Sequence, residues 1–311
     1  MSRWRVGVAT AVVLAAISAI PVVIAYLSGS DVELVYRSAV GIGVNSVAVG
    51  YIVGWPVSEY VWRDFERLVP LLDADQAAQA RRELAHAFAN RGVTVARTIG
   101  IAYGVIVTVQ VLIDVARGRT GSTLYLWVPL LVPVLWATIL PALWRLLRVT
   151  WFVFRLGARV RVDLGDPRGL GVFADIGIRH LLLIVIGLSV IPMQAILTGG
   201  LGLLDFLPPL LVTTPVAVVV LALPIWGIHR AIVAAKAAEL LRATGAMNEA
   251  PPDSDRRLLW WLYRQQIAQS SEWPVAAGSA TRIAFYVVIP PLAWVAAALV
   301  QDVVAKVLGL E

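Results

Sequence analysis

Seven apolar stretches divide this chain, and they constrain its fold more than any other feature. Each is close to the ~20 residues that an α-helix needs to cross the hydrocarbon core of a bilayer. Their ranges are Val6–Leu27, Ser38–Trp55, Thr94–Asp114, Thr123–Trp144, His180–Gly200, Phe206–Ile228 and Arg282–Val303. The pattern predicts an all-α polytopic membrane protein with seven transmembrane helices, in which residues 1–311 form a single integral membrane domain.

The composition agrees with a membrane protein. Hydrophobic residues make up 59% of the chain and charged residues only 15%, which is too little polar surface to cover a soluble domain of this size. We therefore expect the lipid bilayer itself to be a partner of the chain. Because there is no cysteine, disulfides and thiolate metal sites are excluded.

The positive charges lie on one side of the predicted membrane. If the N-terminus is cytoplasmic, 22 of the 26 Lys and Arg residues fall in cytoplasmic segments. The positive-inside rule then predicts a multi-pass protein of the cell membrane with its N-terminus in and its C-terminus out. Because topology accounts for the formal charge of +6, we expect no nucleic acid as a partner.

The N-terminal stretch has a second interpretation. Met1–Arg5 followed by an apolar run could be a signal peptide. However, Val6–Leu27 is longer than the ~7–15 residues of a signal h-region, and no small-x-small cleavage site follows it. We therefore interpret it as the first span.

The predicted cytoplasmic connectors, 56–93, 145–179 and 229–281, are long, whereas those on the other side are short. The first should contain a polar helix from Asp73 to Asn90, because start and stop signals flank that stretch. The third should restart a helix after Ser254, with Leu259, Trp260, Leu262, Tyr263 and Ile267 on one arc and Arg257 and Arg264 opposite. This helix could lie on the membrane surface or pack against other cytoplasmic helices, and the sequence leaves both placements open.

Small residues at every fourth position indicate close helix packing. Such spacing presents a shallow groove that lets two helix backbones approach, although glycine can also be tolerated in lipid without a packing role. The residues are Ser46, Gly50 and Gly54 on the second predicted span and Gly100 and Gly104 on the third.

The last predicted span carries the features typical of a pore-lining helix. Its double proline, Pro290 and Pro291, would suit a hinge or a discontinuous helix, although a simple kink without function explains it as well. One face of the span has residues at spacings of three and four, apolar over most of its length and polar at the outer end. These candidate pore-lining residues are Val287, Pro291, Trp294, Ala298 and Gln301, with Asp302 at the mouth. The same face could instead pack against neighbouring spans.

The sequence contains few features that indicate an enzyme. No motif for a catalytic nucleophile, a nucleotide loop or a metalloprotease occurs, and we expect no catalytic residues and no cofactor. His180 and His229 begin and end consecutive predicted spans, which would bring them to one depth. They are weak candidates for a metal or haem site, and ordinary interfacial histidines without a ligand are the simpler explanation, so we expect no metal.

In layout the chain resembles the insect odorant and gustatory receptor superfamily of tetrameric cation channels and its distant relatives. The resemblance covers seven spans, N-in and C-out, short outer loops, long helical inner connectors and a surface helix that leads into the last span. That family carries Thr-Tyr, five apolar residues and Gln-Phe in its last span, whereas here Thr281 and Tyr286 are separated and Asp302 follows Gln301. The resemblance implies a homo-oligomer, a tetramer by analogy, and a pore-lining role for Gln301 alone.

The leading functional hypothesis is a channel-type or ligand-sensing protein that conducts small ions, with its ligand unknown. A membrane scaffold or accessory subunit without its own conductance is an alternative hypothesis. A small-solute transporter is another, although the lack of an acidic residue at any span centre weighs against a proton-coupled carrier. Uncharged polar residues such as Asn45, Thr108 and Gln194 lie within the spans, where they fit a neutral, hydrophobically gated pathway or simply form hydrogen bonds between helices.

Overall fold

The computed structural model of the protein describes residues 3–29, 32–55, 57–88, 90–117, 128–164, 170–198, 203–252 and 254–274. Every regular element within these ranges is a helix, which confirms the all-α class. The elements are α1 (Arg3–Leu27), α2 (Val32–Gly54), α3 (Val57–Leu68), the 3-10 turn η1 (Val69–Leu71), α4 (Ala74–Ala87), α5 (Asn90–Ala116), α6 (Val128–Gly157), α7 (Gly171–Thr198), α8 (Leu203–Glu249) and α9 (Asp255–Gln269).

Several of these helices have the length and composition of membrane spans. In the described part of the chain, five helical stretches are long and apolar enough to cross a bilayer. They are Arg3–Leu27, Ser38–Leu71, Ala74–Gln110, Leu131–Gly157 and Thr214–Glu249. The seventh expected span, Arg282–Val303, lies outside the described residues.

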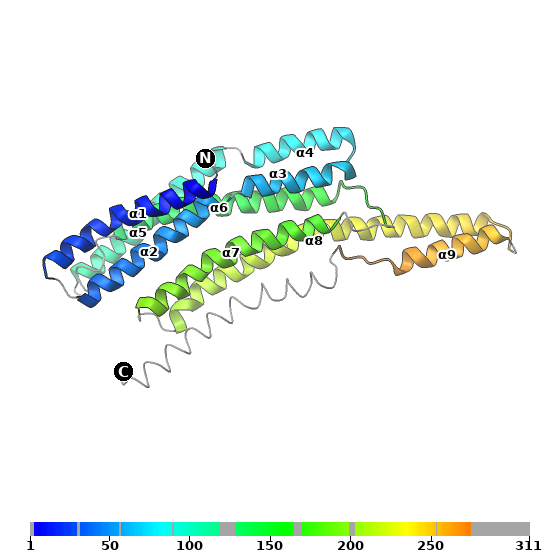
Figure 1. Ribbon diagram of the computed structural model, residues 1–311. Helices are drawn as coiled ribbons and strands as arrows, with labels where there is room; N and C mark the ends of the chain where they lie inside the picture. The colour runs from blue at the N-terminus through cyan, green and yellow to red at the C-terminus, as the bar shows by residue number, and fades with distance from the viewer. Residues whose placement is uncertain are drawn as a thin grey trace.

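The helices are arranged in neighbouring pairs (Figure 1). α1 packs along α2, α5 along α6, and α7 along α8, while α6 also contacts α8 and α2 contacts α7. α1 ends at Leu27 because Gly29 takes a φ of 77°, a left-handed conformation that favours glycine, and the chain then turns back into α2.

The largest cluster of buried side chains in the described residues lies where α3, η1 and α4 pack against the C-terminal half of α6 and the start of α7. We call it the connector core. Its largest fully buried side chains include Phe65, Leu84, Leu156 and Phe173. Ile228 and Ile232 of α8 complete it, so the connector core joins the 56–93 and 145–179 connectors to the longest helix.

The expected helix after residue 73 is present but begins differently from the prediction. Asp73 is the residue that precedes α4, yet its carboxylate makes no side-chain cap and instead pairs with Arg161. α4 ends at Ala87, and α5 begins at Asn90, so the predicted stop at Asn90 becomes a short turn between two helices.

α8 extends beyond the connector core and pairs there with α9, forming what we call the arm, residues 229–273 (Figure 1). Ser254 caps α9, since its Oγ accepts a hydrogen bond from the Arg257 backbone N–H at 3.3 Å. α9 packs along α8, as one of the two placements that the sequence left open predicts.

The face of α9 that packs differs from the predicted arc. Ile267 is buried, and Tyr263 and Arg264 reach Glu239 and Thr244 of α8. Leu259, predicted on the packed arc, is 66% exposed, and Leu262 is exposed as well. The predicted arc therefore packs against α8 only in part, at Ile267 and Tyr263, while Leu259 and Leu262 stay exposed.

Candidate functional site

The glycines predicted to mark helix packing lie in two separate interfaces. A Cβ on Gly50 would come within 2.6 Å of the Gly7 carbonyl oxygen, and Gly54 lies against Gly7 as well, so both face α1. A Cβ on Gly100 would come within 2.3 Å of the Trp136 carbonyl oxygen, and one on Gly104 within 2.5 Å of Pro133 Cα, so both face α6. Ser46 is buried, and its hydroxyl has no hydrogen-bond partner among the described residues.

The two candidate metal-binding histidines have different surroundings. His180 is buried, and its Nδ1 lies 3.2 Å from the hydroxyl of Thr150. His229 stacks on Trp273 with ring centroids 4.1 Å apart, and its Nδ1 lies 2.9 Å from the Glu272 carbonyl oxygen. Within the described ranges no group of three or more His, Asp or Glu side chains could hold a metal ion.

The candidate pore-lining and hinge residues, Val287, Pro290, Pro291, Trp294, Ala298, Gln301 and Asp302, all lie outside the described residues. The site that the structure does describe is therefore a different one, and it lies between α4, α6 and α8 beside the connector core.

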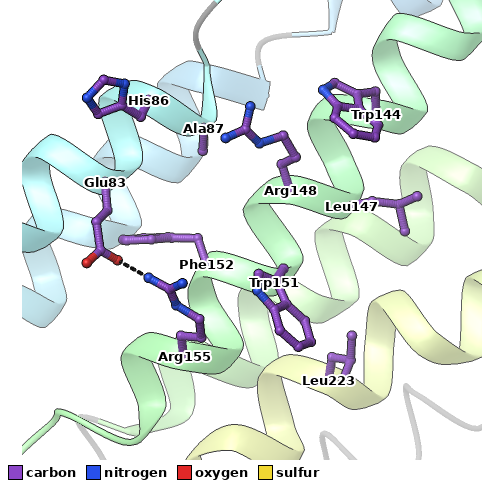
Figure 2. Close-up of a pocket in the computed structure, with 10 residues that line it drawn as sticks. All are labelled: Glu83, His86, Ala87, Trp144, Leu147, Arg148, Trp151, Phe152, Arg155 and Leu223. Atoms are coloured by element: carbon purple, nitrogen blue, oxygen red, sulfur yellow. Dashed lines mark hydrogen bonds and ion pairs between the residues drawn. The ribbon is translucent and has the colours of Figure 1, made fainter. Parts of the chain in front are cut away.

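A groove with a cavity of about 480 Å³ opens between these three helices (Figure 2). Its lining residues are Glu83, His86 and Ala87 of α4, Trp144, Leu147, Arg148, Trp151, Phe152 and Arg155 of α6, and Leu223 of α8. The volume and the largely apolar lining with a few charged groups are typical of a site for a small ligand.

One face of α6 supplies most of the groove. Trp144, Arg148, Trp151 and Arg155 follow one another at spacings of four, three and four residues, so they form one stripe along the helix. The opposite side of α6, with Val149, Val153 and Leu156, is buried in the connector core. The stripe is visible in the sequence as a regular spacing, but the spacing alone does not show that α4 and α8 close a groove over it.

Ion pairs fix the α4 side of the groove. Glu83 accepts hydrogen bonds from Arg155 at 2.7 Å and from Arg159 at 3.0 Å, and Gln79 donates to the same carboxylate at 3.0 Å. Burial on its own raises the pKa of Glu83, but the hydrogen bonds and positive charges of Arg159 and Arg155 outweigh it and hold the pKa below its ordinary value of 4.5. Glu83 is therefore an ionised anchor between α4 and α6.

A second polar cluster lies where α3 meets α7. Asp64 is only 1% exposed and forms an ion pair with Arg179, while Arg67 approaches its other oxygen at 3.5 Å. The Arg179 guanidinium also lies 5.5 Å from the centre of the Tyr60 ring. The sequence signal was an acidic residue on the apolar stripe of α3, between Val61, Phe65 and Leu68.

The fold and this site define an all-helical protein in which long apolar helices run into a charged, ligand-sized groove. Comparison with protein-family models, curated proteins and solved structures gave no match to the chain.

Proposed function

We propose that the chain is a seven-span membrane protein, N-in and C-out, that senses a ligand at its cytoplasmic side and conducts small ions. The groove between α4, α6 and α8 is the sensor in this proposal, and the last span, Arg282–Val303, lines the ion pathway. The protein works as a homo-oligomer, with a tetramer favoured by analogy with the receptor superfamily that its layout resembles.

The observation that carries the proposal is the continuity of the helices that line the groove. α6 and α8 each contribute side chains to the cavity, and each continues without a break into a stretch apolar enough to cross a membrane. A ligand that contacts α4 and α6 together changes the relative position of a connector helix and a spanning helix. It can therefore shift an equilibrium between two arrangements of the spans if it binds one more tightly.

Conductance is tested by single-channel recording of the full-length protein in planar bilayers. We expect Gln301→Leu to alter the conductance, because it removes the polar group that replaces part of an ion's hydration shell. We expect Asp302→Asn to weaken the cation preference, because it removes a negative charge at the mouth. Val300→Leu, adjacent to Gln301 but outside the three- and four-residue spacing, is the control that should leave both properties unchanged.

The parent protein must pass current for this proposal to stand. If it passes none under any voltage or ligand, or if Gln301→Leu and Asp302→Asn both behave like the parent, the last span has no role in conduction.

A scaffold or accessory subunit is the second candidate function, and one observation favours it. The arm exposes large apolar side chains away from the connector core, namely Leu241, Leu258, Leu259, Trp261 and Leu262. An accessory subunit would purify with a partner protein bound over these residues and would pass no current alone.

A further inference from the structure

We infer that the groove between α4, α6 and α8 binds an anionic phospholipid, with the headgroup phosphate at Arg148 and an acyl chain along Leu147 and Trp144. The inference deepens the proposed function and rests on its placement of this groove at the cytoplasmic face of the membrane.

The charge of the groove favours an anion. Arg148 lines the cavity and forms no ion pair with any described residue, and Figure 2 shows its guanidinium extending toward α4 near Ala87. Glu83, the only carboxylate in the lining, is already engaged by Arg155 and Arg159. The groove therefore carries an excess of positive charge with one guanidinium available to a phosphate.

The lining changes from charged to apolar along α6. Arg155 and Glu83 form the end nearest the connector core, whereas Leu147 and Trp144 lie about two to three turns closer to the apolar half of the helix. Leu223 of α8 lies beside Trp151, between these two ends (Figure 2). A ligand that matches this gradient has an anionic head and an apolar tail that points toward the membrane.

The tryptophans place the groove at a membrane interface. Trp144 is 42% and Trp151 is 53% exposed, although both are large aromatic side chains on a helix whose other face is buried. Indole rings are enriched at the headgroup level of bilayers, where their apolar body and polar N–H are both accommodated. Basic pockets between helices on the cytoplasmic side are the typical sites for anionic lipid headgroups.

A soluble phosphate fits the groove less well than a lipid does. Its binding would use Arg148 but would gain nothing from Trp144 and Leu147, whose apolar surface would stay in contact with water. The lipid uses both ends of the groove, and for this reason we commit to it.

Native mass spectrometry of the full-length protein in detergent tests the inference without any measurement of current. The protein is mixed in parallel with phosphatidylglycerol, with phosphatidylcholine of the same chains, and with inorganic phosphate. We expect the parent to retain phosphatidylglycerol in preference to phosphatidylcholine, and Arg148→Gln to reduce that preference by about fivefold, the effect of one cationic side chain near a lipid surface. Arg82→Gln, which removes an exposed arginine of α4 that does not line the groove, is the matched control and should keep the preference.

A second variant addresses the apolar end and leaves every charge in place. Trp144→Ala removes apolar surface beside Leu147 from a side chain that is exposed, and we expect it to lower retention of phosphatidylglycerol while the fold, followed by circular dichroism, is unchanged. Retention that is equal in the parent, Arg148→Gln and Trp144→Ala overturns the inference. Displacement of the lipid by inorganic phosphate would also overturn the inference, because the site would then be one for a soluble anion.

The two proposals fail in different ways. A protein that passes no current but loses phosphatidylglycerol preference in Arg148→Gln rejects the channel and supports the lipid site. A protein that passes current and shows no lipid preference rejects the lipid site and leaves the channel standing.

Discussion

The α1–α2 pair and the connector core are held together in opposite ways. Between α1 and α2, the backbones themselves meet at Gly7, Gly50 and Gly54, and the only buried residues of α1 are Gly7 and Ser18. In the connector core, large side chains such as Phe65 and Phe173 are fully buried and ion pairs surround them. Close backbone contact suits lipid, where burial of apolar side chains brings no hydrophobic gain. Burial of large apolar side chains suits water, where it does.

The contrast shows that each half of this chain is built for a different surrounding. α1 presents apolar side chains outward along its whole length, including Val12 and Ile24, which would be costly in water. The connector helices α3 and α4 instead expose charged residues such as Glu66 and Arg81, which pair with each other at 3.0 Å. We therefore expect the stability of the connector half to depend on its ion pairs, and that of the apolar half to depend on the small residues at its helix contacts.

The largest effect is expected at the buried ion pair of the connector half. Arg179→Gln removes the partner of Asp64 and leaves a carboxylate that is nearly inaccessible to water. We expect a loss of about 3 kcal/mol in the free energy of unfolding, because breaking a buried pair leaves an uncompensated charge. The measurement is chemical unfolding in detergent, followed by circular dichroism.

Arg161→Gln is the matched control for that substitution. It removes an arginine that also pairs with an aspartate, Asp73, but both side chains are exposed. We expect at most about 1 kcal/mol. Equal losses in the two variants would show that burial of Asp64 contributes nothing.

A smaller effect is expected at the helix contact of the apolar half. A Cβ on Gly7 would lie 2.4 Å from the Gly50 carbonyl oxygen and 2.7 Å from Gly54 Cα, and neither backbone atom can move aside alone. We expect Gly7→Ala to cost about 1–3 kcal/mol through separation of the helices. Thermal unfolding in detergent or in nanodiscs measures it.

Gly43→Ala is the control on α2, because a Cβ there meets no atom within 4 Å. Alanine is a better helix former than glycine by up to about 1 kcal/mol, so this variant should be neutral or more stable than the parent. A Gly7→Ala protein as stable as Gly43→Ala would mean that α1 and α2 do not approach as closely as described.

The smallest effect concerns the ionised anchor Glu83 and depends on pH. Its folded pKa lies below the unfolded value of 4.5, so its contribution is fully present above that pH and is lost as the pH falls through the folded pKa. We expect acidification to destabilise the parent by up to about 1 kcal/mol more than Glu83→Gln, which cannot titrate. Unfolding midpoints measured from neutral pH to below pH 4.5 give the comparison.

Arg82→Gln is the control for the pH series, since it removes a charge from α4 without touching Glu83. It should keep the parent's pH dependence. If Glu83→Gln lost stability in acid as steeply as the parent, another carboxylate would be responsible.

Helix type and approximate length could be predicted from the sequence because apolar runs of this length have few other structures available. The second predicted span, Ser38–Trp55, corresponds to α2, Val32–Gly54, with most of the difference at the polar start. Where the run continues into a polar helix, as α8 does to Glu249, the end of the apolar stretch did not mark the end of the helix. The composition of the sequence indicates which stretch can span a membrane, whereas the capping residues determine where the helix itself ends.

The residues that contact one another across different helices could not be predicted, because they lie far apart in the chain. The spacing of Gly50 and Gly54 indicated a close contact but could not show that α1 provides it. Asp64 and Arg179 are 115 residues apart, and Glu83 and Arg155 are 72 apart, so no local pattern links either pair. The groove was missed for the same reason, since Leu223 and His86 join the α6 stripe only through tertiary packing.

The length of α8 has a mechanical consequence. Its 47 residues form one continuous helix, which at 1.5 Å per residue is a rod about 70 Å long. A rod tilted by about 5° around its midpoint would move each end by roughly 3 Å, so a reorientation of its apolar half would be transmitted to the tip of the arm as a displacement of similar size. Ile228 and Ile232, near that midpoint, are held in the connector core, which is where such a tilt would pivot.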